Sequence, residues 1–195
     1  MKVEDSGMPE VQVWESFFNP DSILSKLKLT PDLEEAIEFG CGYGTFTIPA
    51  ARVIQGTLYA IDIEQAMLDF TNSSAQREKL LNVKCILRDF MSIGTGLADN
   101  SADYAMVFNI LHTKNPVDLL KEAFRVLKVN GLVGIIHWNY DSTTPRGPAM
   151  DIRPNPEQCR EWAVQAGFTP GNEGIIDLPP YHYGMTLVKV ECKTL

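Results

Sequence analysis

Three glycines at alternating positions stand in the stretch EFGCGYGT, residues 38–45, with an acidic residue two places before the first. Glycine permits positive φ angles and lets a ligand touch the main chain where a Cβ would stand in the way. Such a turn can hold a dinucleotide's pyrophosphate or another nucleotide-derived cofactor, or it can be a plain turn. The NAD fingerprint requires G-x-G-x-x-G, but Thr45 stands at the third position and the extra glycine is Gly44. No G-K-[ST] follows, so a P-loop is absent.

Acidic and amide side chains follow the next β-type runs. Asp62 ends the run TLYAID, and a carboxylate there can accept hydrogen bonds from both hydroxyls of a ribose. Asp89 and Phe90 follow VKCIL and offer an acceptor and a ring suited to adenine, and Asn109 lies near the end of ADYAMVFNI. Each acid alone could be a loop residue or a helix cap. Because the carboxyl ends of parallel strands share one ligand-binding edge, we expect these side chains to converge on one ligand.

The elements that position these residues alternate between β-type and helical runs from about residue 33, which indicates an α/β fold with a mostly parallel sheet. We expect strands at 36–39, 57–62, 83–87, 102–110 and 132–138. Helices are expected at 45–55, 63–80, 117–128 and 156–168, the third ended by Asn130 and Gly131. The runs 174–178 and 185–192 are expected to form an antiparallel hairpin through the connection PPYHYG.

One or two short helices are expected ahead of the first strand. Asn19-Pro20 and Thr30-Pro31 each have the form of an N-cap followed by proline at the first helical position. Trp14, Phe17 and Phe18 lie at helical spacing, which is typical either of core packing or of a lid over a ligand.

Length and composition limit the classes of protein that are possible. The 195 residues suit one domain, expected to cover residues 1–195 with 1–32 as an N-terminal helical extension. The net charge of -8 argues against nucleic acid as a partner. No apolar run approaches the ~20 residues of a membrane span, and MKVEDSGMPE lacks the pattern of a secretory signal. The four cysteines, Cys41, Cys85, Cys159 and Cys192, form no CxxC pair. We therefore expect reduced thiols, no cysteine metal site and, by default, a cytoplasmic location.

The motifs resemble those of the class I S-adenosylmethionine-dependent methyltransferases. EFGCGYG matches the family's first motif, acid-x-G-x-G-x-G, and YAIDIEQAML resembles its second-strand motif. RDF, SADYAMVFNILH and FRVLKVNG follow in the family's order, so the resemblance covers about residues 33–138. It implies a single Rossmann-like, seven-stranded, mostly parallel sheet with an antiparallel last strand and helices on both faces. It also implies S-adenosylmethionine as the cofactor.

The resemblance further implies which residues border the cofactor. Those expected at its methionine part are Glu38, Gly40, Cys41, Gly42 and Gly44. Those expected at its adenosine are Asp62 on the ribose hydroxyls, Ile63, Met67, Asp89 on the adenine amine and Phe90 beside the ring. Asn109 is expected to help hold the amino group through its main chain. Asp103 also matches a family position, but it begins the fourth strand at the opposite edge, so we expect a structural role.

Methyl transfer to a hydroxyl or amine is helped by a general base, and the chain has three histidines, His112, His137 and His182. All three are expected to face the rim of the cofactor cleft. His112 is the first candidate for acceptor contact and His137 the second, and each could also be a structural histidine. A three-histidine metal site is geometrically possible, but we expect no metal.

The segment 139–156 is a long connection with four prolines, which we expect to form an ordered loop at the cleft. Arg146 and Arg153 within it could clamp a carboxylate or phosphate of the acceptor, or they could pair with the protein's own acids. The residues expected at the acceptor are Trp14, Tyr140, Arg146, Arg153 and His182.

The leading function is therefore methyl transfer to a small-molecule acceptor. The family's amino-directed members often carry a prolyl-prolyl-aromatic motif after the fourth strand, where this chain reads NILH. Methylation of amino groups in nucleic acid or protein loses support accordingly. Two alternatives stay open: a catalytically silent methyltransferase-like scaffold or activator, and an NAD-type oxidoreductase.

Overall fold

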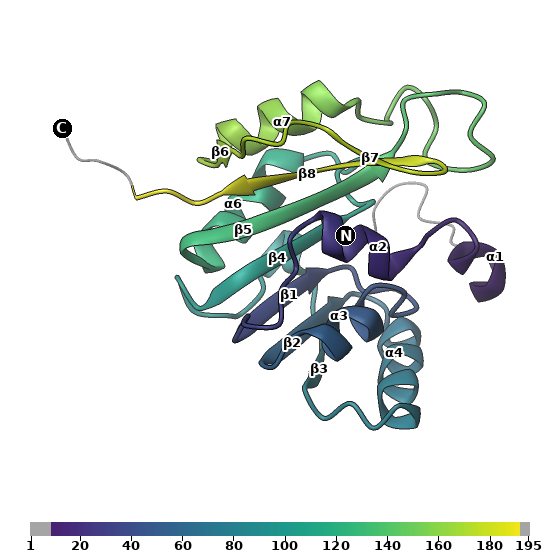
Figure 1. The fold of residues 1–195 in the computed structure, drawn as a ribbon, viewed down its shortest axis with the longest axis vertical. Coiled ribbons are helices and arrows are strands. Elements are labelled where there is room, and N and C mark those ends of the chain that lie inside the picture. Colours follow the sequence, from purple (N-terminus) through teal and green to yellow (C-terminus); the bar gives the residue numbers. More distant parts are fainter. Residues whose placement is uncertain (1–8, 192–195) are drawn as a thin grey trace.

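The computed structural model describes residues 9–191, so Cys192, whose thiol is expected to be reduced, lies outside them. An eight-stranded sheet runs through the molecule in the order β3-β2-β1-β4-β5-β8-β6, and β7 pairs with β8 (Figure 1). The sequence predicts seven strands, and the additional one is the two-residue β6 (Thr169–Pro170).

Five neighbouring strands are parallel: β3 (Val83–Leu87), β2 (Thr57–Asp62), β1 (Glu35–Phe39), β4 (Ala102–Phe108) and β5 (Leu127–Trp138). β8 (His182–Val188) runs antiparallel to β5, and β7 (Ile176–Leu178) runs antiparallel to β8. The predicted fold class, a Rossmann-like, mostly parallel sheet with an antiparallel last strand, is confirmed. The strand order reverses between β1 and β4, and at such a switch point α/β sheets bind ligands.

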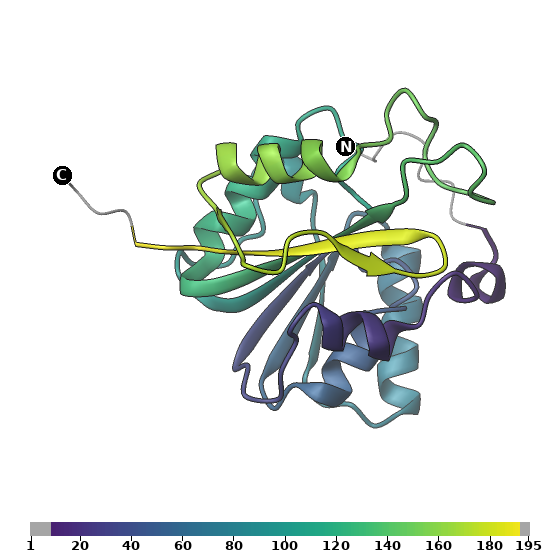
Figure 2. The same ribbon diagram turned by 45° about the horizontal axis from the view of Figure 1, so that its top comes forward.

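Helices cover both faces of the sheet (Figure 2). On one face lie α2 (Pro20–Lys26), α3 (Thr47–Val53) and α4 (Gln65–Arg77). On the other face lie α5 (Phe90–Ile93), α6 (Pro116–Val126) and α7 (Pro156–Gln165). The short α1 (Val11–Glu15) lies beyond the carboxyl end of β5, where the rings of Trp14 and Trp138 are 6.4 Å apart.

The sheet divides the core into two apolar layers because adjacent residues of a strand point to opposite faces. Val107 and Ile135 pack with the apolar side of α6, whereas Met106 and Ile136 pack with α2 and α3. A parallel sheet that is buried on both faces needs nearly continuous apolar strands, which is why ADYAMVFNI is recognisable in the sequence. The polar residues at the strand tips therefore stand out from their surroundings.

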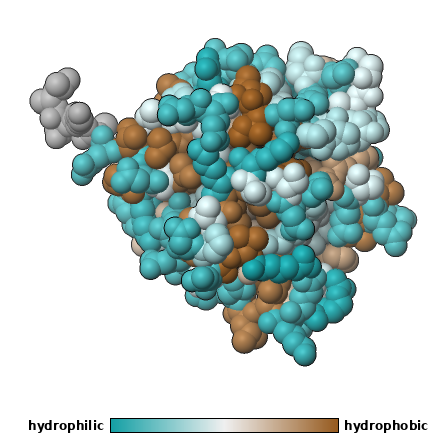
Figure 3. Space-filling view, viewed as in Figure 1, coloured by the Kyte–Doolittle hydropathy of each residue, from teal (hydrophilic) through white to brown (hydrophobic). Residues whose placement is uncertain are grey.

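The outside of the molecule is largely polar on the side drawn in Figure 3, where the hydrophobic residues form separate small areas. Among the helices of residues 9–191, none combines the length and the hydropathy of a membrane span.

The predicted end of α6 is wrong. The helix ends at Val126, and β5 begins at Leu127 and passes through Asn130, whose φ is 68°. The Nζ of Lys189 donates hydrogen bonds to the main-chain oxygens of Phe124 and Leu127 over 2.8 and 2.7 Å. A lysine far along the chain thus satisfies carbonyl groups at the helix end, so the turn sequence at 130–131 is not needed for this purpose.

Two further local predictions are wrong. Thr30 and Pro31 form a turn and begin no helix, because the carbonyl of Pro31 accepts a hydrogen bond from the N–H of Gln55 over 3.0 Å. β8 begins at His182, inside the predicted connection, because His182 pairs in register with Trp138 of β5. By contrast, Asn19 caps α2 as predicted, accepting a hydrogen bond from the N–H of Ser22.

Candidate active site

The glycine turn after β1 has a conformation that favours glycine at each position. Gly40, Gly42 and Gly44 have φ angles of 76°, 52° and 77°. A Cβ on Gly40 would lie 2.9 Å from Cδ1 of Ile110, and one on Gly44 would lie 2.9 Å from Oγ1 of Thr71. The left-handed conformation and the close neighbours both exclude a larger residue without strain. The chain therefore presents bare main chain at the tip of β1.

The carboxylate of Asp62 ties this turn to the tip of the neighbouring strand. Its Oδ2 accepts a hydrogen bond from the N–H of Gly42, and its Oδ1 accepts one from the N–H of Glu64, both over 2.9 Å. Asp62 is buried with 8% of its surface exposed. Each carboxylate oxygen can accept a further hydrogen bond, so the group is held in place and can still receive the two hydroxyls of a ribose.

Glu38 is fully enclosed beneath the glycine turn. Its Oε2 accepts a hydrogen bond from the hydroxyl of Thr47 in α3. Burial raises the pKa of Glu38 to about 8, the hydrogen bond from Thr47 opposes this rise, and the charge of Asp62 adds to it. The carboxyl group is therefore largely protonated at neutral pH in the structure described. A cationic ligand nearby would favour its ionised form.

Cys41 is a buried packing residue of the turn. Burial raises the pKa of its thiol, and the charges of Glu38 and Asp62 raise it further. A thiol of this kind is a poor nucleophile. Its sulfur lies 3.9 Å from Oγ1 of Thr71, which donates a hydrogen bond to the main-chain oxygen of Gly42 over 3.0 Å. Thr71 thus supports the turn, although no motif in the sequence points to it.

The residues expected around adenosine follow β2 and β3. Ile63 is 38% exposed and Met67 is half-buried in the first turn of α4. Asp89 caps α5, accepting hydrogen bonds from the N–H and the hydroxyl of Ser92 over 3.1 and 2.8 Å. Phe90 is buried and meets Phe39 edge to face at 5.3 Å between ring centroids. Phe90 is therefore primarily a core residue, and it follows Asp89, whose carboxylate caps α5.

Asn109 closes the group at the tip of β4. Its φ is 54°, and its N–H donates a hydrogen bond to the main-chain oxygen of Ile136 over 2.8 Å. Both polar atoms of its side-chain amide are buried and have no hydrogen-bond partner among residues 9–191. Buried amides are normally paired, and a strained residue with an unpaired amide is typical of a ligand site.

These features fit S-adenosylmethionine. The bare glycine turn, the fixed carboxylate of Asp62 and the unpaired amide of Asn109 lie at the tips of β1, β2 and β4, around the switch point of the sheet. None of these groups requires a diphosphate, and no cationic side chain is needed beside a ligand that already carries a sulfonium charge.

The sequence motif gives no indication of the role of Tyr43. Its hydroxyl donates a hydrogen bond to the main-chain oxygen of Pro9 over 3.0 Å, and its ring lies 5.2 Å from that of Phe70. The start of the described chain is thereby attached to the glycine turn. No residue type was expected at this variable position of the motif, so only the structure could reveal the contact.

The three histidines do not all face the rim, so this prediction is wrong. His137 and His182 are completely buried, whereas His112 is partly exposed. His182 pairs with Trp138 and His137 pairs with Tyr183, so the two buried rings lie on opposite faces of the sheet. Nδ1 of His112 lies 3.3 Å from Nε2 of His137.

His182 lies within an aromatic cluster. Its ring is 4.5 Å from Phe18 and 4.3 Å from Trp138, measured between centroids. Phe17 also packs on Trp138, at 5.3 Å. Burial lowers the pKa of His182 to about 3, so the ring is neutral. The aromatic residues before α2 thus pack over the tips of β5 and β8, with His182 enclosed between them.

Arg153 organises the loop in which it lies. Its guanidinium donates hydrogen bonds to main-chain oxygens of Pro148 and Asp141 and to the hydroxyl of Thr144, the shortest over 2.6 Å. Only 7% of its surface is exposed. The expected acceptor clamp therefore does not hold for Arg153, because its donors are taken up by the loop. Arg146 and Tyr140 of the same loop are exposed, and Tyr140 is exposed over 53% of its surface.

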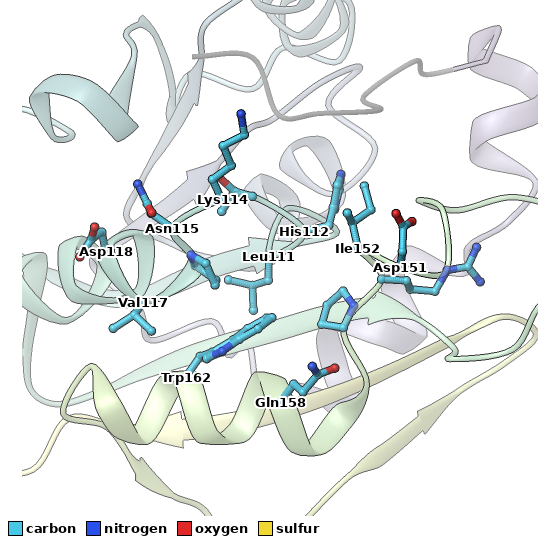
Figure 4. Close-up of a pocket in the computed structure, with 14 residues that line it drawn as sticks. Leu111, His112, Lys114, Asn115, Val117, Asp118, Asp151, Ile152, Gln158 and Trp162 are labelled. Atoms are coloured by element: carbon cyan, nitrogen blue, oxygen red, sulfur yellow. The ribbon is translucent and has the colours of Figure 1, made fainter.

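A pocket of about 480 Å³ opens beside His112 (Figure 4). The loop between β4 and α6 forms one wall, and residues 151–154 with α7 form the other. In Figure 4, Trp162 points from α7 toward Leu111 and Val117, and His112 stands beside Ile152. The polar and charged residues of the lining are Thr113, Lys114, Asn115, Asp118, Asp151, Arg153 and Gln158.

Asp103 has the structural role that the sequence predicts. Its carboxylate accepts hydrogen bonds from the N–H groups of Glu34 and Glu35 and forms an ion pair with Lys128 over 2.7 Å. Within residues 9–191, no set of His, Cys, Asp and Glu side chains is grouped so that it could hold a metal ion.

Residues 37–135, half of the chain, match the sequence profile of the family described as "Methyltransferase domain". The chain therefore belongs to this methyltransferase family. The matched residues run from β1 into β5 and contain the glycine turn, Asp62 and Asn109.

Curated relatives agree with this assignment. The chain is 32% identical over 109 residues to an uncharacterised methyltransferase-like protein of Schizosaccharomyces pombe, covering 56% of this chain and 40% of that protein. It is 27% identical over 120 residues to a demethylmenaquinone methyltransferase of Lactobacillus johnsonii, covering 60% of this chain and 47% of that protein. The match thus spans less than half the length of either relative.

Solved structures share the fold. A SAM-dependent methyltransferase from Aquifex aeolicus superposes with a TM-score of 0.80 at 21% identity, covering 89% of this chain and 91% of that one. The geranyl diphosphate C-methyltransferase of Streptomyces coelicolor superposes with a TM-score of 0.71 at 16% identity, covering 88% and 78%. The [4+2]-cyclase SpnF superposes with a TM-score of 0.72 at 19% identity, covering 92% and 82%. The fold therefore occurs with more than one activity.

Proposed function

We propose that this protein transfers a methyl group from S-adenosylmethionine to a small-molecule acceptor. The observation that carries the proposal is the link between Gly42 and Asp62 at adjacent strand tips. This hydrogen bond holds a bare main-chain turn and a carboxylate together in one unit. Such a unit suits a ligand that has both an amino-acid part and a ribose. Membership of the methyltransferase family supports the same conclusion.

In this proposal the cofactor supplies a methyl carbon activated by positively charged sulfur. Asp62 binds the ribose hydroxyls, and the glycine turn together with Asn109 orients the amino-acid part. Ile63 and Met67 flank the adenosine, with Asp89 at the adenine amine. Because the methyl carbon is already activated, the protein contributes mainly orientation and exclusion of water. The aromatic residues that cover the tips of β5 and β8 contribute to the exclusion of water.

In this proposal the acceptor binds at the open side of the same strand tips. His112 and the exposed loop residues Tyr140 and Arg146 are the groups that we assign to it. A small molecule suits the pocket beside His112, and the net charge of -8 does not favour nucleic acid. The cytoplasmic location stays a prediction.

A second candidate function is cofactor binding without methyl transfer. The observation in its favour is that the [4+2]-cyclase SpnF has the same fold. Release of S-adenosylhomocysteine from S-adenosylmethionine, screened against a library of small hydroxyl, amine and carbon acceptors, separates the two functions. Turnover with any acceptor supports the enzyme, whereas tight binding without turnover across the library supports the scaffold.

Calorimetric titration tests the cofactor assignment. We expect S-adenosylhomocysteine to bind with 1:1 stoichiometry and NAD to produce no heat. Asp62→Ala should raise Kd by about tenfold or more, because hydrogen bonds to a charged group contribute about 1.5–3 kcal/mol and 1.4 kcal/mol is a factor of ten. Glu157→Gln, an exposed change in α7, is the control and should leave Kd unaltered. Binding of NAD in place of S-adenosylhomocysteine would refute the proposal.

A further inference from the structure

The chain before α2 joins two parts of the sheet edge that β4 separates. At its beginning, the main-chain oxygen of Pro9 accepts a hydrogen bond from the hydroxyl of Tyr43 in the glycine turn over 3.0 Å. Near its end, the ring of Phe17 lies 5.3 Å from that of Trp138 at the tip of β5. Figure 1 shows α1 beyond the carboxyl ends of the strands. Because β4 lies between β1 and β5 in the sheet, residues 9–18, here called the strap, span the tip of β4.

The strand tips that the strap spans carry groups that we assign to the cofactor. The bare main chain of Gly42 and Gly44 lies at the tip of β1. Asn109 lies at the tip of β4, and its buried side-chain amide has no hydrogen-bond partner among residues 9–191. Buried amides are normally paired, and a ligand that rests on the glycine turn can supply the partner. A strap across these tips therefore covers the proposed cofactor.

The strap has little stability of its own. Its helix, α1, has five residues, none of them buried, and its N-cap makes no side-chain hydrogen bond. Isolated helices shorter than about 12–15 residues are marginal in water, and Val13 is 48% exposed. The position of the strap is therefore set by the contacts at its two ends.

The two ends of the strap are held with different strength. At its later end, the ring of Phe18 packs on those of Phe46 and His182, at 5.1 and 4.5 Å between centroids. Such ring contacts add to the burial of a large apolar side chain. At its earlier end, the link is the hydrogen bond from Tyr43 to Pro9, and one neutral hydrogen bond contributes little net free energy. We therefore expect the earlier end to open first, with Phe18 as the fixed point.

Tyr43 belongs to the same turn that would touch the cofactor. It stands between Gly42 and Gly44, whose φ angles are 52° and 77°. Its ring meets that of Phe70 in α4 at 5.2 Å between centroids and an angle of 65°, and this contact sets the direction of its hydroxyl. A ligand that touches the main chain of the turn therefore also orders the residue that holds the strap.

We propose that the strap is a lid over the cofactor and that Tyr43 is a positioning residue, which holds the lid closed through Pro9. This proposal rests on the proposed binding of S-adenosylmethionine. When the hydrogen bond from Tyr43 breaks, the strap moves away from the glycine turn and the cofactor exchanges. When it forms again, the strap excludes water from the strand tips during methyl transfer.

The lid makes a quantitative link between two rates. If the cofactor leaves only while the strap is open, its dissociation rate is proportional to the open population. The amide hydrogens of the strap exchange with solvent from the same open form. Those of Val13 and Trp14, for example, are bonded to the main-chain oxygen of Glu10 over 3.0 Å when the strap is closed. A substitution that weakens the latch should therefore raise both rates by the same factor.

Tyr43→Phe tests this link, because it removes the hydroxyl and keeps the ring on Phe70. Mass spectrometry measures hydrogen exchange of residues 11–18 in the ligand-free full chain, and stopped-flow displacement measures dissociation of S-adenosylhomocysteine. We expect both rates to rise together by about two- to twelvefold, the contribution of one neutral hydrogen bond. Tyr59→Phe removes a hydroxyl from the middle of β2 and is the control, in which neither rate should change.

Either rate rising alone would overturn the proposal. Faster exchange without faster dissociation would mean that the strap does not cover the ligand. Faster dissociation without faster exchange would mean that Tyr43 acts on the glycine turn alone. If Tyr43→Phe does not fold, Trp14→Ala gives the same test, because it loosens the strap from the ring of Trp138, 6.4 Å away, and should raise the two rates together.

Exchange in the wild-type protein separates the lid from the proposed function. Saturation with S-adenosylhomocysteine should slow exchange of residues 11–18, since the ligand favours the closed strap. Equal exchange with and without bound ligand would overturn the lid and leave the cofactor assignment intact. Calorimetry on the same sample shows whether S-adenosylhomocysteine binds at all, and a failure to bind would overturn the proposed function together with the lid.

Discussion

The N–H of Gly42 donates a hydrogen bond to Oδ2 of Asp62 over 2.9 Å, so the turn after β1 and the last residue of β2 are held as one unit. The same carboxylate accepts from Glu64, at the start of the connection to α4. A ligand that contacts the turn therefore also meets Asp62 without moving either strand. Because the geometry is set before binding, little ordering is needed when the cofactor arrives.

Gly44→Ala should destabilise the protein more than Gly174→Ala. Both glycines have positive φ, 77° and 66°, and this alone costs a larger residue about 1–2 kcal/mol. A Cβ at Gly44 would also lie 2.9 Å from Oγ1 of Thr71, whereas one at Gly174 would have no atom of the described structure within 4 Å. Urea unfolding of both variants gives the comparison. Equal losses of unfolding free energy in the two variants would mean that the side chain of Thr71 moves aside without destabilising the protein.

Glu38→Gln should remove a pH dependence of stability. The pKa of Glu38 is about 8 in the folded protein, above its ordinary value of 4.5, because the group is buried. Its contribution is therefore fully present below about pH 4.5 and is lost as pH rises through about 8. The difference in unfolding free energy between wild type and Glu38→Gln should fall by up to ~1.4 kcal/mol per pH unit across this window. A flat difference curve would show that Glu38 titrates normally.

His182→Phe should remove a pH dependence of the opposite sign. Burial lowers the pKa of His182 to about 3, below its ordinary value of 6.5. The native state therefore loses stability as pH falls from about 6.5 toward 3, since only the unfolded chain takes up the proton. Neither ring nitrogen has a hydrogen-bond partner within residues 9–191, so the variant should be at least as stable as wild type at pH 7. Midpoints of urea unfolding between pH 4 and 7 measure both effects. A large loss of stability in His182→Phe at pH 7 would contradict a purely apolar packing role for the His182 ring.

Arg153→Ala and Arg146→Ala should separate the loop from the acceptor. Arg153→Ala leaves several loop carbonyls without donors and should cost about 2 kcal/mol or more, with faster proteolysis within 139–155. Arg146→Ala changes an exposed residue and should alter stability by no more than about 0.5 kcal/mol. In Arg146→Ala, turnover of the acceptor should nevertheless fall, while the affinity for S-adenosylhomocysteine stays unchanged. A loss of that affinity in Arg146→Ala would contradict the assignment of Arg146 to the acceptor.

The strand tips that carry the proposed cofactor residues could be predicted because they depend on short-range patterns. The strands 57–62 and 83–87 have the predicted bounds, since apolar β-type runs and flanking turns define them locally. The tips of consecutive parallel strands must share an edge, so Asp62 and Asn109 could be placed near Gly42 from the chain order alone. Their hydrogen bonds, and the strained φ of Asn109, required coordinates.

The remaining differences arise from long-range contacts. The end of α6 depends on Lys189, which lies more than sixty residues beyond Phe124 and has no local signal. The sequence places His137 and His182 at the same edge, but register decides that they lie on opposite faces. Arg153 is used by carbonyls of a loop without periodicity, so its partners follow from the folded path of that loop.

A crystal structure of the protein with S-adenosylhomocysteine shows whether the tips of β1 and β2 bind this molecule. We expect both ribose hydroxyls to lie within hydrogen-bond distance of the Asp62 carboxylate and the amino-acid part to rest on residues 40–44. A ligand bound elsewhere, or a ribose that makes no contact with Asp62, would contradict this expectation.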